Sequence, residues 1–466
     1  MQKPKRTIIS SALLTTLVSS VVHAGAFSLY TEGSTVAVGN YGAGIAAEGA
    51  DASIGWYNPA GLVLLDKQQL VVSGVGVLAS TNLSGTSTFN TQPTPPISPY
   101  VQNFSQLQGG KNALVPALHY AKPLGEWAVF GLSVTAPFGL STEYSNSSPV
   151  RYAATLSDLK TIDVSPELGG KLTDNFSIGA GLDFQWAQVK FNRMLGSPAA
   201  LQFLQSLGVP LTPNFLDSES FNKGHSFAMG FHAGVLGMFN ANHTRIGLNY
   251  QSQVKHRFNG YSQLTGRLAD PALMNPNAVF RTDTLFSGPI EMPEVVTLSA
   301  YHDLSSQWAL LGSVVYTGWD CFNQIRLTNV AAYSTDLAQQ VLVNSASPQD
   351  YENAWRFAVG ANYKVNDQWL IRFGGGFDQT PTINAERDVR LPDADRWALS
   401  IGTHYQMFPA VGFDVGYTYL WADGDAVINR TEALGTTSSY NVNATARPHA
   451  HLLGLQAVWT IDQPTK

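Results

Sequence analysis

The fold follows from a pattern that residues 411–421 show most clearly. The segment reads Val-Gly-Phe-Asp-Val-Gly-Tyr-Thr-Tyr-Leu-Trp. In an extended strand, successive side chains point to opposite faces. One face then carries Val411, Phe413, Val415, Tyr417, Tyr419 and Trp421, and the other carries Gly412, Asp414, Gly416 and Thr418. The segment therefore predicts a β-strand whose two faces meet an apolar and a polar environment.

Residues 159–172, 368–378 and 396–406 repeat this alternation. Apolar-out with polar-in is typical of a transmembrane β-barrel, but a soluble β-sandwich gives the same pattern in any one strand. The connections between the strands separate the two. Six links are short: 123–126, 173–175, 241–244, 305–307, 366–367 and 408–410. Between them lie long polar links: 80–112, 138–158, 193–224, 261–290, 323–353, 380–395 and 423–449.

Strict alternation of short and long links is typical of an antiparallel up-and-down barrel with short periplasmic turns and long external loops. Seven loops and six turns predict roughly fourteen strands. A barrel of that size is wider than its own side chains can fill, so another segment must occupy the lumen. The all-β prediction is thus a transmembrane β-barrel over residues 68–466 with an N-terminal plug, or hatch, over residues 25–67.

Composition supports this class. Only 13% of the residues are charged and 11% are aromatic, whereas soluble domains carry about 25% charged residues. No run of 18 apolar residues follows the N-terminal segment, which excludes a helical membrane protein. The single cysteine, Cys321, excludes an internal disulfide. A net charge of −6 gives no reason to expect nucleic-acid binding.

Residues 1–24 have the pattern of a secretory signal peptide. Lys3, Lys5 and Arg6 precede an apolar stretch from residue 8 to 22, and Val22-His23-Ala24 resembles a cleavage site. We expect cleavage after Ala24; a short anchoring helix is the alternative. The expected location is the outer membrane of a Gram-negative bacterium.

The segment between the signal and the first strand is rich in glycine and alanine and ends in Asn58-Pro59-Ala60. Trp56 and Tyr57 favour burial of this segment as a plug, whereas a flexible leader is the alternative. At this point the chain resembles the FadL family, outer-membrane transporters of long-chain fatty acids and related hydrophobic compounds. The resemblance rests on the hatch motif Asn58-Pro59-Ala60 and, in order, on residues 130–140, 293–294, 307–309, 316–319 and 391–396.

The resemblance implies several sites. The hatch residues Asn58, Pro59 and Ala60 are expected to hold the plug at a lateral gap in the wall. The gap itself is expected at a kinked third strand containing Val134, Ala136, Pro137 and Gly139, although Pro137 alternatively only ends the strand. The ligand pocket is expected to contain Phe27, Arg193 and Arg326, the arginines orienting a carboxylate. A solvated charge at a loop base is the alternative for each arginine.

Two external loops are expected to form an apolar groove that first captures the cargo. Its residues are Leu201, Phe203, Leu204 and Leu207 on one loop and Leu264, Leu268, Leu273 and Met274 on the other. An exposed apolar patch often marks a binding site, and a helix packed on the barrel rim is the alternative.

The implied function is passive transport of long-chain fatty acids by external capture, lumenal binding and lateral release. Expected partners are fatty acids or similar hydrophobic molecules, outer-membrane lipid and the barrel-assembly machinery; no cofactor, metal or catalytic residue is expected. Aromatic or other uncharged hydrocarbons are the alternative cargo. A general porin and a lipid hydrolase are further alternatives. A hydrolase needs a nucleophile beside a histidine. The spacing of Ser and Thr indicates no such pair for the strand histidines His119, His232, His302 and His404. The C-terminal tail departs from the family by following Trp459 with seven further residues.

Overall fold

The computed structural model describes residues 26–92 and 97–461. The predicted signal peptide, its cleavage site and the end of the C-terminal tail, residues 462–466, lie outside the described residues.

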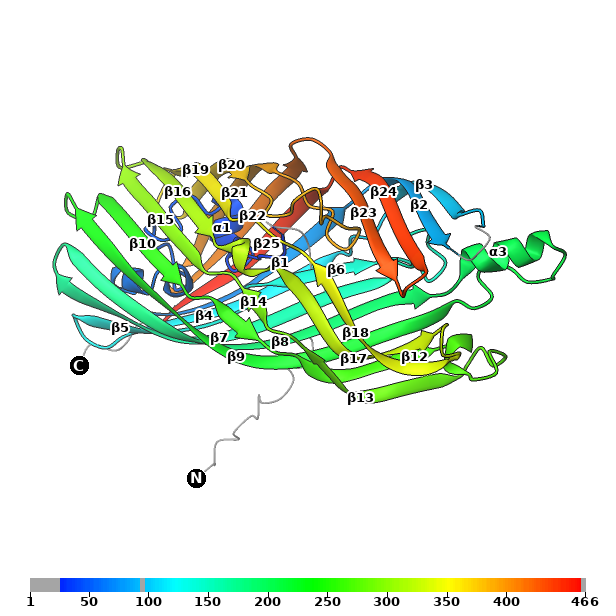
Figure 1. Ribbon diagram of the computed structural model, residues 1–466. Helices are drawn as coiled ribbons and strands as arrows, with labels where there is room; N and C mark the ends of the chain where they lie inside the picture. The colour runs from blue at the N-terminus through cyan, green and yellow to red at the C-terminus, as the bar shows by residue number, and fades with distance from the viewer. Residues whose placement is uncertain (1–25, 93–96, 462–466) are drawn as a thin grey trace, which may run out of the picture.

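Among the described residues, fourteen antiparallel strands form a closed ring (Figure 1). The ring closes where β1 pairs with β25, from Gln68 opposite Ile461 to Ser80 opposite His449. In ring order the strands are β1 (Gln68–Ser80), β4 (Ala113–Pro123), β5 (Ala128–Thr135), β7 (Leu156–Thr173), β8 (Phe176–Leu195), β9 (Ser218–Phe239), β10 (Thr244–Gln251), β15 (Val295–Asp303), β16 (Trp308–Thr317), β19 (Ala354–Lys364), β20 (Trp369–Asp378), β21 (Arg396–Phe408), β22 (Val411–Ala422) and β25 (His449–Ile461). The prediction of a fourteen-stranded barrel is confirmed.

The six short links lie at one end of the barrel and the long links at the other. The short ones, 124–127, 174–175, 240–243, 304–307, 365–368 and 409–410, fall within a residue or two of their predicted positions. The short links mark the periplasmic end, because outer-membrane barrels have short periplasmic turns and longer external loops. β1 begins and β25 ends at this same end. The opposite end is therefore external.

The two faces of the wall differ as the alternation predicts. On β22, the Phe413 side chain is 42% exposed on the outer face and Asp414 is 3% exposed on the inner face. The outer face is thus an apolar surface for lipid, and the inner face is a polar surface for the plug.

The long external links contain further strands and helices, which sequence periodicity did not separate from loop. Four strands form a small sheet in the order β23 (Ala426–Leu434), β24 (Ser438–Ala446), β2 (Leu83–Thr91) and β3 (Tyr100–Leu107). A second group extends the wall outward: β12 (Asn259–Thr265), β13 (Val279–Ser287), β17 (Gln324–Ser334) and β18 (Gln339–Pro348). The remaining elements are β6 (Gly139–Glu143), β11 (Val254–His256), β14 (Ile290–Met292), α3 (Pro198–Ser206), η2 (Arg267–Ala269) and η3 (Trp319–Cys321).

The plug consists of α1 (Thr35–Asn40), α2 (Ile54–Tyr57) and η1 (Pro59–Leu64), all buried inside the ring. Ser34 begins α1 by accepting a hydrogen bond from the Val36 N–H, and Tyr41 ends it in a left-handed conformation. The wall comes very close to α1: a Cβ atom at Gly402 would lie 2.7 Å from the Cα of Gly39. Glycine at this point of β21 lets helix and wall meet backbone to backbone. Within the described ranges, no helix is both long and apolar enough to cross a membrane.

Candidate functional site

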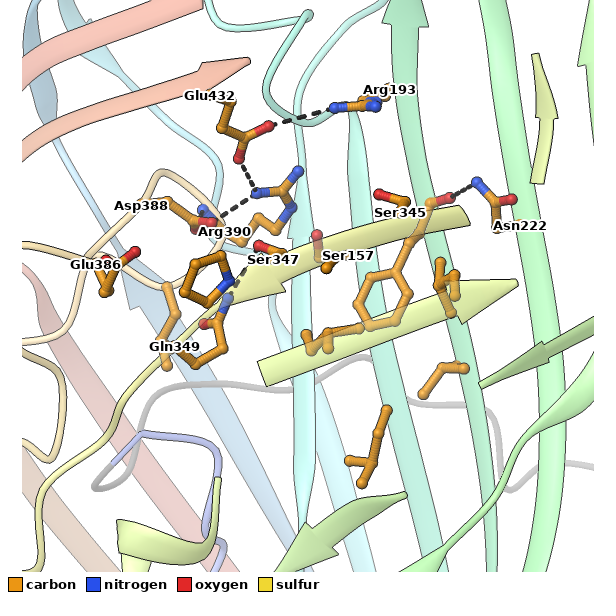
Figure 2. A pocket seen from close by; sticks show the side chains of 18 of the residues that line it. Ser157, Arg193, Asn222, Ser345, Ser347, Gln349, Glu386, Asp388, Arg390 and Glu432 are labelled. Carbon is orange, nitrogen blue, oxygen red and sulfur yellow. Dashed lines mark hydrogen bonds and ion pairs between the residues drawn. The ribbon is translucent and has the colours of Figure 1, made fainter. Parts of the chain in front are cut away.

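A cavity of about 380 Å³ lies between the first residues of the plug and the external segments (Figure 2). This volume is within the range of about 300–1,000 Å³ typical of small-molecule pockets. Its lining divides into an apolar part and a charged part. The apolar part includes Phe27, Leu140, Leu159, Val189, Ile290, Met292, Phe322, Ile325 and Leu391.

Phe27 lines the apolar part of the cavity. Its side chain is 4% exposed and touches other rings edge to face. The ring centroids lie 4.6 Å from Trp319, 5.2 Å from Phe322 and 6.1 Å from Phe138. Because Phe27 belongs to the plug and its neighbours to the wall and η3, the cavity wall is completed only when the start of the plug is in place.

Three backbone contacts fix the start of the plug. The Leu29 N–H donates to the carbonyl of Pro137 at 2.8 Å, and the Gly139 N–H donates to the carbonyl of Phe27 at 2.9 Å. The Ala26 N–H donates to Oδ2 of Asp393 at 2.9 Å. The plug thus begins as a short extended segment bound to the third strand of the barrel.

The third strand is interrupted where it meets the plug. β5 ends at Thr135, β6 begins at Gly139, and both pair with β7, so residues 136–138 leave the ladder. On the other side, β4 pairs with β5 only from Leu118 to Pro123. The preceding β4 residues, 113–117, have β1 as their ladder partner among the described residues. Val134 lies at the end of the intact ladder, and Ala136 and Pro137 lie in the break.

The hatch motif lies elsewhere on the wall. Asn58 is fully buried and its Nδ2 donates to the carbonyls of Ala46, at 2.8 Å, and Val235 on β9, at 3.1 Å. Its Oδ1 accepts from the Ala60 N–H, and the Ala60 carbonyl accepts from Ser177 Oγ on β8 at 2.8 Å. Asn58 therefore fixes the plug to β9, and Ala60 fixes it to β8. Among the described residues, these hydrogen bonds do not reach the interrupted third strand.

The charged part of the cavity contains Arg193, one of the two predicted arginines. β8 continues to Leu195, and Arg193 lines the cavity. Its Nη1 lies 3.3 Å from Oε2 of Glu432 (Figure 2). Arg326 is different: its neighbours Ile325 and Leu327 line the cavity, while its own side chain is exposed on the opposite face of β17. The structure therefore brings Arg193, and not Arg326, to the cavity.

Two arginines that sequence analysis missed join Arg193. Arg390 Nη1 lies 2.6 Å from Asp388 and 3.3 Å from Glu432. Arg430 lies 3.5 Å from Glu386, 3.8 Å from Asp388 and 3.5 Å from Glu432. Burial disfavours ionisation of Asp388, but Arg390 and Arg430 hold the pKa of its carboxyl below the ordinary value. Three arginines and three carboxylates therefore form a charge-balanced cluster at one side of an apolar cavity.

The predicted external groove is only partly formed. Leu201 is buried, whereas Phe203, Leu204 and Leu207 are exposed on and just after α3. α3 packs against β2 and β3. On the other loop, Leu264 and Leu268 are buried and Leu273 is partly buried in a cluster with Ala331, which leaves Met274 exposed. The two loops contact each other through Leu216, which packs against the cluster of Leu264 and Leu268, and the exposed residues of α3 and Met274 add apolar surface at the external end.

These features define a class: a plugged outer-membrane barrel with an internal apolar cavity that ends in charged side chains. The chain matches the model of the outer membrane protein transport protein family (OMPP1/FadL/TodX) over residues 15–460. It belongs to this family. The protein is therefore an outer-membrane transporter of hydrophobic compounds and not an enzyme.

Relatives and solved structures agree with this assignment. The chain is 28% identical over 436 residues to a long-chain fatty acid transport protein of Escherichia coli (strain K12), covering 90% of this chain and 93% of the relative. It is 28% identical to outer membrane protein P1 of Haemophilus influenzae over 98% of this chain and 99% of the relative. The crystal structure of a Pseudomonas aeruginosa FadL homologue has the same fold, with a TM-score of 0.76, 23% identity and coverage of 93% and 99% of the two chains. The Pseudomonas putida toluene transporter TodX also has this fold, with a TM-score of 0.57, 14% identity and coverage of 89% and 95%.

Proposed function

We propose that this protein carries long-chain fatty acids across the outer membrane. One cavity contains both an apolar part, which Phe27 completes, and a cluster of three arginines. This combination is the observation that supports a fatty acid as the cargo. An alkyl chain gains free energy from the apolar part, and a carboxylate accepts paired hydrogen bonds from a guanidinium. A molecule with both parts uses the whole cavity.

The route begins at the external end, where Phe203, Leu204 and Leu207 expose an apolar surface to arriving ligand. The cavity below is the internal binding site. The break at residues 136–138 is the exit, because the ladder between β4 and the third strand ends at Val134, and beyond it the plug bonds to the backbone of Pro137 and Gly139. Lateral release through the wall requires the start of the plug to move away from the third strand.

Energetics favour such a movement. Each buried methylene contributes about 0.8 kcal/mol, so roughly fourteen of them contribute about 11 kcal/mol before the costs of association. A rigid cavity would hold this ligand for a long time. Moving Phe27 removes part of the apolar wall and shortens the lifetime of the complex. No energy source is required, because cargo moves down its own gradient.

The aromatic rings around Phe27 support a second cargo. Trp319, Phe322 and Phe138 surround it edge to face, an arrangement that also suits a flat aromatic hydrocarbon. Such a cargo makes no use of the arginine cluster.

Calorimetry on the purified protein separates these cargoes. Oleate should bind more tightly than methyl oleate, and both more tightly than toluene. Equal binding of oleate and methyl oleate would exclude the carboxylate role, and preferential binding of toluene would favour the hydrocarbon. Single-channel recording tests the porin alternative: the buried plug predicts no steady large conductance, and a steady open current would contradict the transport route.

A further inference from the structure

The outer face of β7, β8 and β9 changes character abruptly near its external end. These strands are neighbours in the wall (Figure 1). One cross-strand row on this face is apolar, with Ile162, Trp186 and Phe227 side by side. The next row outward contains Lys160, Gln188 and His225. The row after that contains Asp158, Lys190 and Lys223. We call these last two rows the basic patch.

The basic patch begins where the hydrocarbon of the membrane ends. On β8 the outer face is apolar from Phe176 to Trp186. Ten residue steps of about 3.3 Å along a strand tilted by about 40° give an apolar band roughly 25 Å tall. That is the height of the apolar band of outer-membrane barrels. Gln188 and Lys190 are the next outward-facing residues and lie at the level of the lipid head groups.

Positive charge in the basic patch is only partly neutralised. Asp158 is its carboxylate, and it lies 3.7 Å from Lys160 and 3.9 Å from Lys190. Lys223 makes no ion pair within residues 26–92 and 97–461. Lys190 and Lys223 are directly opposite on adjacent strands, an arrangement that repels unless an anion lies between or above them. The patch therefore has room for an external anion.

Other strands carry aromatic residues near their external ends on this outer face. Tyr316 on β16 is opposite Trp355 on β19, and Trp397 on β21 is opposite Trp421 on β22. Aromatic rings suit a general membrane–water interface. Lysines in a cluster suit phosphate instead. The basic patch on β7, β8 and β9 therefore differs from the aromatic residues at the same end of β16, β19, β21 and β22.

We propose that the basic patch binds the phosphate groups of a phosphorylated glycolipid in the outer leaflet, of the lipid A type. The apolar row of Ile162, Trp186 and Phe227 directly below it would contact the acyl chains of the same molecule. Continuity between the lysines and the lipid-facing band favours a lipid over a soluble anion, because only a lipid occupies both surfaces at once.

The test uses the mature, full-length protein in mild detergent. Native mass spectrometry would measure binding of bisphosphorylated lipid A to the wild type and to the combined variant Lys160→Gln, Lys190→Gln and Lys223→Gln. A matched control removes three exposed lysines from the short-turn end: Lys122→Gln, Lys171→Gln and Lys364→Gln. Lys223→Gln alone provides a second variant that removes no ion pair of the protein. Lipid A without phosphates and phosphatidylglycerol serve as competitors.

The combined variant should bind bisphosphorylated lipid A about tenfold more weakly or worse, given the usual contribution of a basic residue at a membrane surface. Lys223→Gln should lose less affinity for bisphosphorylated lipid A. The matched control, with Lys122, Lys171 and Lys364 replaced, should bind it like the wild type. Neither competitor should displace lipid A efficiently. Wild-type binding by the combined variant would overturn the proposal. Efficient competition by dephosphorylated lipid A or by phosphatidylglycerol would also overturn it, because the surface would then recognise any lipid or any anionic lipid.

Discussion

Asp393 and Ala26 are 367 positions apart in the chain, yet Oδ2 of Asp393 accepts the backbone N–H of Ala26 at 2.9 Å. Asp393 is 1% exposed and also accepts a hydrogen bond from Thr380 Oγ1 at 2.7 Å. A late external segment thereby holds the start of the plug, and with it Phe27, against the cavity.

Replacing Asp393 with Ala should loosen this end of the plug. A hydrogen bond to a charged group contributes about 1.5–3 kcal/mol, so dissociation of bound oleate should become about tenfold faster. Stopped-flow displacement of a fluorescent fatty acid measures this rate. Asp395→Ala is the matched control, because Asp395 accepts from the Thr380 N–H and has no bond to Ala26. Equal rates in both variants would show that the Ala26 contact does not limit release.

The break in the third strand predicts that a large side chain there blocks exit without blocking capture. Ala136→Arg fills the break, while the cavity above keeps its lining. The variant should bind oleate with the wild-type affinity and deliver it to cells at a small fraction of the wild-type rate. Uptake of labelled oleate, with heat-modifiable migration as the folding control, makes the measurement. Wild-type uptake by this variant would place the exit elsewhere.

Arg193 and Arg390 should matter for the charge of the ligand and little for its alkyl chain. The double variant Arg193→Ala and Arg390→Ala should weaken oleate binding by about 1.5–3 kcal/mol and methyl oleate binding by less. Arg326→Ala removes one positive charge from the exposed face of β17 and is the control. Calorimetry with both ligands on all variants tests this, and equal losses for acid and ester would contradict a head-group role.

Glu432 should oppose an anionic ligand. It lies 3.3 Å from both Arg193 and Arg390, so a ligand carboxylate must compete with it for the same donors. Glu432→Gln removes the competing charge, and oleate should then bind more tightly while methyl oleate changes little. Should the variant bind oleate more weakly, Glu432 would be needed to position the arginines and not to compete with the ligand.

The Asn58 contacts predict a role in holding the plug to β9. Asn58→Ala removes bonds to Ala46, Val235 and Ala60 and leaves buried backbone carbonyls unpaired, at a cost of about 1–3 kcal/mol. The plug should open more often, which single-channel recording would detect as brief conducting events. Ser177→Ala removes one nearby bond to the plug and should give a milder effect. If Asn58→Ala shows no conducting events and keeps the wild-type melting temperature, Asn58 does not hold the plug in place.

The wall was predictable from sequence because its signals are local. The alternation of apolar and polar side chains and the lengths of the links can be recognised from residues that are close in sequence. Together they predicted the fourteen strands and their turns. The same parity predicted that Arg193 faces the lumen, and it lines the cavity, since the pairing of β8 with β9 runs to Leu195 without a register shift. No such parity could be assigned to Arg326, because β17 belongs to an external hairpin paired with β18, where the inner face of the barrel does not set the parity.

The charged cluster was not predictable, because each member is placed by distant segments. Arg430 bonds to Ser347, the Pro348 carbonyl and the Glu386 carbonyl, none of which adjoins it in sequence. The partner of Asn58 on β9 is the backbone carbonyl of Val235, which leaves no mark on residue type. Such contacts exist only once the strands have assembled.

The pairing of β1 with β25 also determines how the plug is held. The plug precedes β1 in the chain and lies inside the ring, with α1 against β20, β21, β22 and β25 and η1 against β7, β8 and β9. Because these strands lie on different parts of the circumference, the plug has all of its wall contacts only in the complete ring. The seam between the first and last strands therefore stabilises the gate as well as the wall, although most of the gate's contacts lie away from that seam.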